Sequence, residues 1–499
     1  MQDGDDDDDP PALQERQRLK KKKTQPTNPL IRGIVAFCDR HSDLSIVLVP
    51  GTGTTTMTTT NDDNKGTNPD PDKMLMLAIS DLPKRYTAFA PLLLLPPSFV
   101  GAGYNTPPTA WTRFYSTLSE SQRADLYRCI AEEGFRGSRI SRIAINAPIA
   151  AEGEVGAHTE VGDDDGGQET TKHHPNVLRS PSGLLPVYGD WGPTLPLEQH
   201  RVRILRPRTE DFEHAFWTAT VQHEGVTQVW APLYTMFSRG NFAEKARILG
   251  LQSWFPGLIT RKAEVEVGSH DNVSMVDVVD MYVGIGYFAF CYLKRGVRRV
   301  YGWDINPWSI EGLRRGCYKN GWECLVVRVD ADGKVEGGGV KELAERIRQG
   351  DQDGPGEENV VRCVAFLGDN KWAAKVLQEI QSEFGRIEGN ARGERPSLNI
   401  THANLGLLPT SKASWSDAVK ILTAMSECRK GGWLHIHENV DIREIERMAE
   451  EVVDQVNGLV QENSDDRCFD LSCAHVEQVK TYAPGVMHCV FDVEIQANG

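Results

Sequence analysis

Strand-like and helix-like segments alternate along the C-terminal half of the chain, from Ser274 onward. Apolar runs rich in Val, Ile and Phe are separated by segments that open with helix-capping residues. This alternation predicts parallel strands joined by crossover helices, because parallel neighbours need a long return connection. The last two runs, 472–483 and 487–495, have no helix between them, so we expect an antiparallel pair. The C-terminal half is therefore predicted to form a seven-stranded, doubly wound α/β sheet with an antiparallel last strand.

The expected elements can be placed from these runs. We expect parallel strands at 274–283, 298–304, 360–367, 397–403 and 433–440, and helices that begin near Tyr287, Asn306, Lys371, Ser414 and Ile442. Asn306 is expected to cap its helix, with Pro307 in the first turn. Residues 322–360 contain a strand-like "ECLVVRV" but are otherwise loop-like, and we interpret them as an insertion in the sheet domain.

The rest of the chain divides by composition into shorter regions. Residues 1–30 run from polyaspartate to a lysine cluster and are expected to form a disordered tail. The predicted order is then a small α+β region at 31–150 with a low-complexity insertion at 51–73, a linker at 151–176, a middle domain at 177–260 and the sheet domain at 261–499. In the middle domain, 201–208 and 226–240 alternate as strands do, and Asn241 is expected to cap a short helix.

Composition argues against several classes of protein. No stretch has about 18 consecutive apolar residues, so we expect no membrane span, and the acidic N-terminus lacks the apolar core of a secretory signal. The ten cysteines include no CxxC pair, which favours reduced thiols in the cytosol or nucleus over disulfides or a metal site. The net charge of −15 argues against a nucleic-acid partner. Tracts such as Asp5–Asp9 and Asp163–Asp165 lie outside the predicted domains, however, so local basic stretches are the better guide.

Two glycines interrupt the apolar run "VVDMYVGIGYFAF" that follows the first predicted strand. Gly284 and Gly286 allow the strand to turn sharply into a helix, and without a Cβ the backbone can approach a ligand closely. With Ala289 they also fit the G-x-G-x-x-A form of dinucleotide sites. The glycine turn alone therefore predicts a nucleotide ligand without saying which one.

Polar residues also end the second and third predicted strands. Asp304 follows Gly286 by 18 residues, where a carboxylate can accept hydrogen bonds from both ribose hydroxyls, and Asp369 and Asn370 are placed to contact an adenine. Each Asp taken alone is equally consistent with a helix cap. Together they lie at the carboxyl ends of strands, where open α/β sheets bind ligands. Five parallel strands closed by an antiparallel pair favour S-adenosylmethionine as that ligand over a dinucleotide.

An ordered set of motifs gives the chain a specific resemblance. The motifs "YGDWGP", "MFSRGNFAEKARI", "DMYVGIGYF", "NPWSIEGLRRG", "GDN", "NLGLLPTS", "GGWLHIHENV" and "YAPGVMH" follow one another between about Leu178 and Glu494. This set resembles the tRNA wybutosine-synthesizing protein 2 family of the fungal type, which is related to the tRNA guanine-37 N1 methyltransferases. The resemblance implies a class I S-adenosylmethionine-dependent transferase fold, preceded by smaller α+β domains.

The resemblance also implies an activity. The enzyme would transfer the 3-amino-3-carboxypropyl group of S-adenosylmethionine, its co-substrate, to carbon 7 of 4-demethylwyosine at position 37 of tRNA(Phe), releasing methylthioadenosine. Its partner would be the anticodon loop of tRNA(Phe), and we expect a cytoplasmic monomer without a metal. Two other interpretations remain open: a tRNA guanine-37 N1 methyltransferase, and a tRNA-binding protein whose catalytic domain has lapsed.

The resemblance assigns five positions to the co-substrate besides the two glycines. Ser238 and Lys245 match positions that contact S-adenosylmethionine, and the Lys245 ammonium would hold the methionine carboxylate. Asp304 stands where the family usually has Glu, and a shorter carboxylate can still bind ribose. Asp369 and Asn370 match contacts on the adenosine side.

Two further positions are catalytic candidates. Asn404 stands where related enzymes place the motif that faces the target base, although His402 and Ala403 replace the usual Asp-Arg before it. Arg239 is placed to contact substrate RNA or the carboxylate, and a surface ion pair is an equally good interpretation.

Other side chains supply options for the chemistry and for RNA binding. Candidates for a general base are His435, His437 and Glu438, although core packing is the commoner role for such residues. Aromatic residues that could line a site for an extruded base are Tyr287, Trp308 and Trp415. Basic residues available for phosphates are Arg201, Arg203, Arg206, Arg208, Arg298, Arg299, Arg314 and Arg315.

Overall fold

A computed structural model of the chain gives the fold. It describes residues 27–41, 44, 46–49, 75–101, 108–146, 178–179, 181, 183–193, 195–221, 223–237, 240–251, 254–258, 273–352, 360–386, 397–424, 431–463 and 469–497. The chain divides into two compact units, one made of 1–149 with 182–191 and the other of 150–181 with 192–499. Most of the predicted tail, the whole of the 51–73 insertion and the 151–176 linker lie outside the described residues.

The smaller unit contains a four-stranded sheet and three α-helices. The strand order is β3 (Thr87–Phe89), β4 (Leu92–Leu95), β5 (Arg142–Ile145) and β6 (Leu185–Tyr188), in which the β4–β5 pair is parallel and the other two pairs are antiparallel. The helices α2 (Pro29–Arg40), α3 (Ala110–Thr117) and α4 (Glu120–Cys129) share an apolar core with the sheet. A separate parallel pair joins β1 (Ile46–Val49) and β2 (Leu75–Ala78). Because β6 completes the sheet, the segment around it belongs to this unit although it follows the predicted linker.

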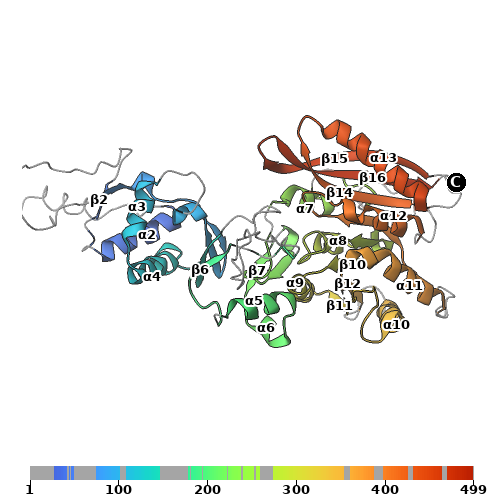
Figure 1. The fold of residues 1–499 in the computed structure, drawn as a ribbon, viewed down its shortest axis with the longest axis horizontal. Helices are drawn as coiled ribbons and strands as arrows, with labels where there is room; N and C mark the ends of the chain where they lie inside the picture. Colours follow the sequence, from blue (N-terminus) through green and yellow to red (C-terminus); the bar gives the residue numbers. More distant parts are fainter. Residues whose placement is uncertain are drawn as a thin grey trace, which may run out of the picture. The chain divides into compact units, whose positions relative to one another are not determined.

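The larger unit is built around an eight-stranded sheet (Figure 1). The strand order is β11 (Glu323–Arg328), β12 (Val361–Leu367), β10 (Arg299–Asp304), β9 (Asp277–Asp280), β13 (Ile400–Leu405), β14 (Gly431–Asp441), β16 (Val486–Ala497) and β15 (Phe469–Ala483). The first six strands are parallel, and β16 pairs antiparallel with both β14 and β15. The chain leaves β9 towards one edge and later fills the other side from β13, so the winding direction changes between these two strands. The doubly wound, mainly parallel α/β sheet expected from the sequence is confirmed, with eight strands in place of seven.

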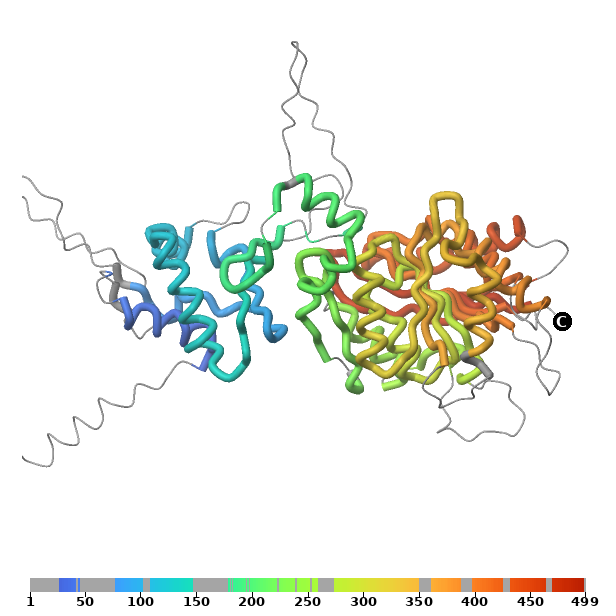
Figure 2. Tube along the Cα trace, turned by 90° about the horizontal axis from the view of Figure 1, so that it is seen from below, coloured from blue at the N-terminus to red at the C-terminus, as the bar shows by residue number. Residues whose placement is uncertain are grey.

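Helices cover both faces of this sheet (Figure 2). On one face lie α7 (Phe242–Ile248), α8 (Ala289–Arg295) and α9 (Pro307–Lys319), and on the other α10 (Gly339–Gln352), α11 (Ala373–Arg386), α12 (Trp415–Ala424) and α13 (Ile445–Asn463). Alternate strand residues divide between the faces, so that Val278 packs with α8 and Val279 packs in the core on the opposite face. Among the described helices, none is long and apolar enough to cross a membrane.

The eighth strand comes from the stretch 322–360, which the sequence suggested to be an insertion. This stretch contributes β11 and α10, and β11 pairs with β12 over residues 323 to 328 as the outermost strand of the sheet. Leu325 and Val327 are buried, whereas their neighbour Val326 is 39% exposed. The strand pattern was therefore present in "ECLVVRV", but the loop-like sequence around it concealed its place in the sheet.

The basic segment 201–208 was predicted to be a strand, and this prediction is wrong. Most of it belongs to the helix α5 (Leu197–Leu205). Ile204 packs with the buried Trp308, whose indole N–H donates to the backbone of the same helix, whereas Val202 is 60% exposed. Val202 and Ile204 alternate with basic residues as in a strand, but only Ile204 packs against the rest of the protein. After α5, a hairpin of β7 (Thr218–Val221) and β8 (Thr227–Trp230) leads towards α7.

Candidate functional site

Gly284 and Gly286 lie in the loop that joins β9 to α8, and both have left-handed backbone conformations. Their φ angles are +54° and +88°. A Cβ at Gly284 would lie 2.7 Å from the Tyr287 ring, and one at Gly286 would lie 2.6 Å from the Phe290 ring. Both the backbone conformation and the close packing therefore require glycine, as the sharp turn predicted from the sequence demands.

Asp304, at the end of β10, is hydrogen-bonded to this glycine loop. Its Oδ2 accepts from the Gly284 N–H at 3.0 Å, and its Oδ1 accepts from the Asn306 N–H at 2.8 Å. Burial raises the pKa of Asp304 to about 6, against the lowering effect of these two hydrogen bonds. The group is therefore mostly ionised at neutral pH. Because a carboxylate can accept more than two hydrogen bonds, Asp304 keeps acceptor capacity for hydroxyl groups of a ligand.

The two residues that follow β12 differ in their surroundings. Asn370 is half-buried, and its Nδ2 donates to the backbone carbonyl of Met281 at 2.7 Å, beside the start of the glycine loop. Asp369 is exposed; it caps the turn that follows and pairs with the Lys371 ammonium at 3.1 Å. Asn370 is thus joined to the end of β9, whereas the contacts of Asp369 are those of a surface helix cap.

Lys245, on α7, is connected to the glycine loop through Gln228 of β8. Its side chain is 3% exposed, and its Nζ donates to Oε1 of Gln228 at 3.3 Å. The Nε2 of Gln228 in turn donates to the carbonyl of Gly286 at 3.2 Å. The Lys245 ammonium also lies 5.5 Å from the centre of the Tyr287 ring. Burial lowers the pKa of Lys245, and a cation in such a place favours an anionic group of a ligand as its partner.

Asn404, at the end of β13, faces Asp280 of the neighbouring strand. The two residues are register partners, both are fully buried, and the Asn404 Nδ2 donates to Oδ1 of Asp280 at 3.2 Å. The other oxygens, Oδ1 of Asn404 and Oδ2 of Asp280, have no hydrogen-bond partner within the described structure. Burial raises the pKa of Asp280 to about 7. No role was expected for Asp280, although a carboxyl group inside an apolar strand was a usable signal.

A buried ionic network lies on the face of the sheet that α7, α8 and α9 cover. The sequence did not predict it. Arg247 of α7 forms two hydrogen bonds to Glu244, at 2.8 and 2.9 Å, and its Nη1 donates to Asp492 of β16 at 2.6 Å. Asp492 also pairs with Nδ1 of His435 at 2.7 Å, and Nε2 of His435 lies 2.9 Å from Nδ1 of His402. Burial opposes ionisation of Asp492, but the hydrogen bond from His435 and the charge of Arg247 hold its pKa below the ordinary value. The network fixes α7, and hence Lys245, against the sheet.

The three candidates for a general base all have structural partners. Burial lowers the pKa of His435 and of His437, which favours the neutral form of both rings. His437 pairs with His488 at 3.0 Å. Glu438 accepts hydrogen bonds from the Thr410 hydroxyl at 2.8 Å and from the backbone N–H of Ser411 at 3.0 Å. These contacts favour the packing interpretation over a base in contact with substrate.

Two of the three aromatic candidates are also core residues. Trp308 stacks on Tyr234 with ring centres 3.7 Å apart, and the indole N–H of Trp415 donates to the Ser411 hydroxyl at 3.0 Å. Both tryptophans are at most 2% exposed. Tyr287, half-buried in the glycine loop, is the one of the three that remains placed near the candidate site.

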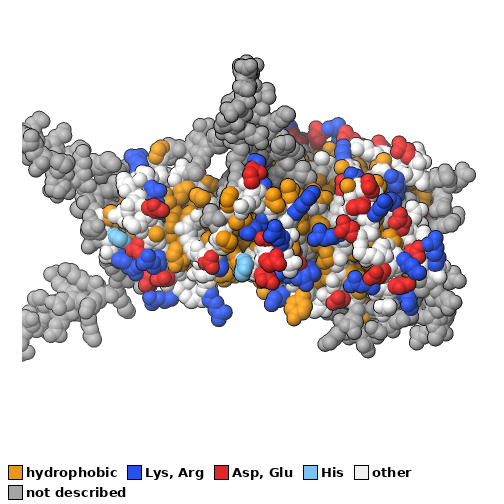
Figure 3. Space-filling model, turned by 60° about the horizontal axis from the view of Figure 1, so that its bottom comes forward, with side chains coloured by type: hydrophobic (Ala, Val, Ile, Leu, Met, Phe, Trp, Pro, Cys, Tyr) orange, Lys and Arg blue, Asp and Glu red, His pale blue; other side chains and the backbone are white. Residues whose placement is uncertain are grey.

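The basic residues considered for RNA binding are mostly engaged within the protein. Arg299 is buried, and Arg298 pairs with Asp277. Four others form ion pairs, namely Arg201 with Glu198, Arg203 with Asp211, and Arg314 and Arg315 with Glu311. Arg206 and Arg208 are exposed after α5. Figure 3 shows one face on which basic and acidic side chains are interspersed rather than gathered into a patch of one sign.

Two predicted site residues, Ser238 and Arg239, lie outside the described residues. The described chain on either side, Phe237 and Gly240, brackets them between β8 and α7. The structure joins Gly284 to Asp304 directly and Gly286 to Lys245 through Gln228. Asn370 is bonded to the backbone just after β9, where the glycine loop begins. Asn404 lies at the neighbouring strand end.

Comparison with known proteins gives two fungal relatives over most of the chain. The chain is 33% identical over 413 residues to tRNA wybutosine-synthesizing protein 2 of Schizosaccharomyces pombe, covering 83% of this chain and 72% of the relative. It is 29% identical over 436 residues to the protein of the same name from Saccharomyces cerevisiae, covering 84% of this chain and 75% of the relative. No family model matches the chain.

The crystal structure of Pyrococcus horikoshii TYW2 in complex with MeSAdo aligns with a TM-score of 0.42 and 15% identity, covering 84% of this chain and 93% of that chain.

Proposed function

The chain belongs to the tRNA wybutosine-synthesizing protein 2 family, and from this we propose that it transfers the 3-amino-3-carboxypropyl group of S-adenosylmethionine to carbon 7 of 4-demethylwyosine at position 37 of tRNA(Phe). The observation that carries the proposal is the connection from Lys245 through Gln228 to the glycine loop. It supplies a buried cation beside the loop expected to hold the co-substrate.

Polar groups at neighbouring strand ends support S-adenosylmethionine as the co-substrate. The Asp304 carboxylate would accept the ribose hydroxyls, and Asn370 would contact the adenosine side, with Asp369 as a more exposed contact. The glycine loop would offer backbone close to the ligand, because Gly284 and Gly286 carry no Cβ. These groups fit a nucleoside with two adjacent hydroxyls.

The choice of transferred group depends on which carbon of the sulfonium faces the nucleophile. We propose that Lys245, together with Ser238, binds the carboxylate of the methionine limb. This contact would hold the methylene carbon of that limb, which is bonded to sulfur, in position to face the nucleophile. A methyltransferase would have to present the methyl carbon instead. Membership of the tRNA wybutosine-synthesizing protein 2 family favours the aminocarboxypropyl transfer over the alternative methyl transfer.

The reaction balances without a metal. The electron-rich carbon of the base attacks the methylene carbon bonded to sulfur, a carbon–carbon bond forms, and the carbon–sulfur bond breaks. Its electron pair neutralises the sulfonium, which leaves as the thioether methylthioadenosine, and the base carbon loses its proton. The positive sulfur already activates the electrophile, so the proton can pass to water. The buried positions of His435, His437 and Glu438 agree with a reaction that uses no strong protein base.

On the RNA side, we propose that Arg239 and Asn404 contact the target base in the anticodon loop of tRNA(Phe). Arg206 and Arg208 are exposed and could contact phosphates, which would make binding sensitive to salt. We further propose that the enzyme acts in the cytoplasm as a monomer.

Mass spectrometry of tRNA(Phe) nucleosides tests this function in cells that lack the gene. The 4-demethylwyosine precursor should accumulate, and the aminocarboxypropyl product should return with the wild-type gene but not with Asp304→Asn. Unchanged product in the deleted cells would contradict the proposal.

A further inference from the structure

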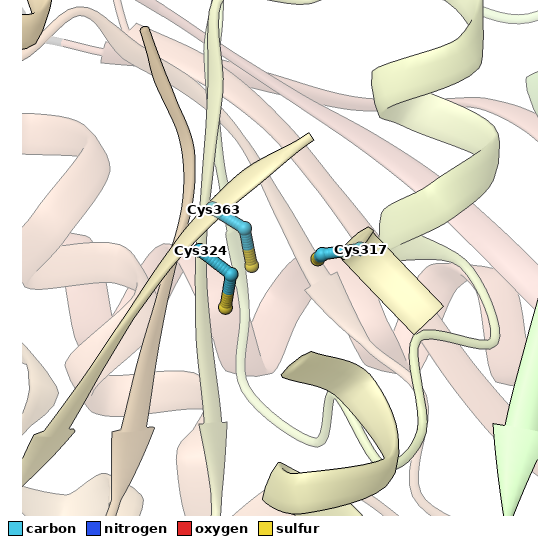
Figure 4. Close-up of side chains that lie close together, drawn as sticks. All are labelled: Cys317, Cys324 and Cys363. Carbon is cyan, nitrogen blue, oxygen red and sulfur yellow. The ribbon is translucent and has the colours of Figure 1, made fainter. Parts of the chain in front are cut away.

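Three cysteine side chains from three separate elements converge in the larger unit, as Figure 4 shows. Cys317 lies in the last turns of α9, Cys324 near the start of β11 and Cys363 near the start of β12. Their sulfur atoms all lie within 4.8 Å of one another. In the described parts of the chain, these three side chains are the group of three or more His, Cys, Asp or Glu residues that lie close enough together to share one metal ion.

The fold explains why these residues meet. Cys324 and Cys363 are register partners in the parallel β11–β12 pair, so their side chains project from the same face of the sheet. α9 packs on that face and brings Cys317 to them. The sequence predicted no metal site, because the three cysteines form no CxxC pair and Cys363 is well separated from the other two along the chain.

We propose that Cys317, Cys324 and Cys363 bind a zinc ion. Zinc takes thiolate sulfur at about 2.3 Å in tetrahedral geometry, which places the sulfurs about 3.8 Å apart. The observed sulfurs therefore need only a small contraction. Three thiols lose their protons on binding, and a water molecule would take the fourth position, because the cluster supplies three protein ligands. Thiolate ligands also select zinc over magnesium or calcium.

The position of the site gives it a structural role. Cys363 lies near the amino end of β12, whereas Asp369 and Asn370 follow the carboxyl end of the same strand. The ion would therefore join the edge strand β11 to β12 and α9, away from the candidate co-substrate site. Edge strands are the exposed parts of a sheet, and such a link would stabilise this one. The inference does not depend on the proposed transfer reaction.

Metal analysis of the purified full-length chain tests the inference. Protein produced in zinc-supplemented medium under reducing conditions should retain one zinc per chain by inductively coupled plasma mass spectrometry. Replacement of zinc by Co²⁺ should give sulfur-to-cobalt charge-transfer absorption of a thiolate site. Each of Cys317→Ala, Cys324→Ala and Cys363→Ala should weaken zinc binding by more than about tenfold, since even changes next to the ligands cost about 10–100-fold.

Two cysteines outside the cluster provide matched controls. Cys489 is fully buried in the same sheet, as Cys363 is, and Cys473 is partly buried in a strand, as Cys324 is. Cys489→Ala and Cys473→Ala should keep the full zinc content. Zinc-free reduced protein, copper in place of zinc, or equal zinc loss in the control and cluster variants would overturn the inference. Circular dichroism of each variant separates metal loss from unfolding.

Discussion

The backbone N–H of Gly284 donates a hydrogen bond to the Asp304 carboxylate at 3.0 Å. This contact joins the loop after β9 to the end of β10, the two adjacent strands that flank the candidate nucleoside site. It orients the carboxylate and stabilises the left-handed glycine turn at the same time. The two features that the sequence suggested independently are thus parts of one structure.

Asp304→Asn should weaken binding of S-adenosylmethionine by about 10–100-fold, because hydrogen bonds to a charged group contribute about 1.5–3 kcal/mol. The wild-type affinity should also fall as the pH decreases through about 6, where the Asp304 carboxylate becomes protonated. Isothermal titration calorimetry between pH 8 and pH 5 measures both effects. Asp332→Asn, at an exposed position, is the control. An unchanged affinity in Asp304→Asn would exclude Asp304 from the site.

Lys245→Met should distinguish two ligands that share the adenosine and sulfur. S-adenosylmethionine carries the carboxylate that Lys245 would hold, and methylthioadenosine lacks it. The variant should bind S-adenosylmethionine about 10–100-fold more weakly, as expected for a lost charge-assisted hydrogen bond, and bind methylthioadenosine with nearly wild-type affinity. Lys294→Met, on the exposed side of α8, should leave both affinities unchanged. Equal weakening for the two ligands would argue against carboxylate binding by Lys245.

Asp280→Asn should stabilise the protein at alkaline pH. The folded-state pKa of Asp280 is raised from 3.8 to about 7, so the ionised group destabilises the folded state above pH 7. That destabilisation amounts to at most about 4 kcal/mol and decreases as the pH falls below 7 towards 3.8. Urea unfolding should therefore show a more stable variant at pH 8 and a smaller difference at pH 5. Asp454→Asn, exposed on α13, is the control, and a pH-independent difference would refute the assignment.

Arg247→Met should destabilise the protein by about 3–5 kcal/mol, because it leaves Glu244 and Asp492 buried without their shared cation. Combining it with Glu244→Gln and Asp492→Asn should restore part of the loss. Urea unfolding measures each step. Arg443→Met, which removes an exposed ion pair, should have little effect. A loss in Arg247→Met no larger than in this control would show that the network does not hold α7.

The sheet of the larger unit was predictable because its signals are local. The Asn306 cap, the Pro307 start and the glycine turn each depend on a few neighbouring residues, and the structure contains all three. The helix at 197–205 was missed because the segment packs as a helix against Trp308, which lies about a hundred positions away in sequence. Local alternation could not reveal which apolar residue would be buried.

The site was only partly predictable for the same reason. The expected strand-end residues are near one another because parallel strands end at one edge. The link between Lys245 and Gln228 joins a helix to a hairpin strand, and no sequence pattern relates the two. Likewise, Asn404 was expected just after the strand at 397–403, whereas it lies inside β13. Its partner Asp280 follows from the strand register, which the sequence does not state.

Double labelling of the donor tests the central claim most directly. Purified enzyme would be incubated with tRNA(Phe) that carries 4-demethylwyosine and with S-adenosylmethionine labelled in either the methyl carbon or the carboxyl carbon. We predict that the carboxyl label enters the RNA while the methyl label leaves in methylthioadenosine. Methyl label in the RNA, with release of S-adenosylhomocysteine, would contradict the proposed orientation of the donor.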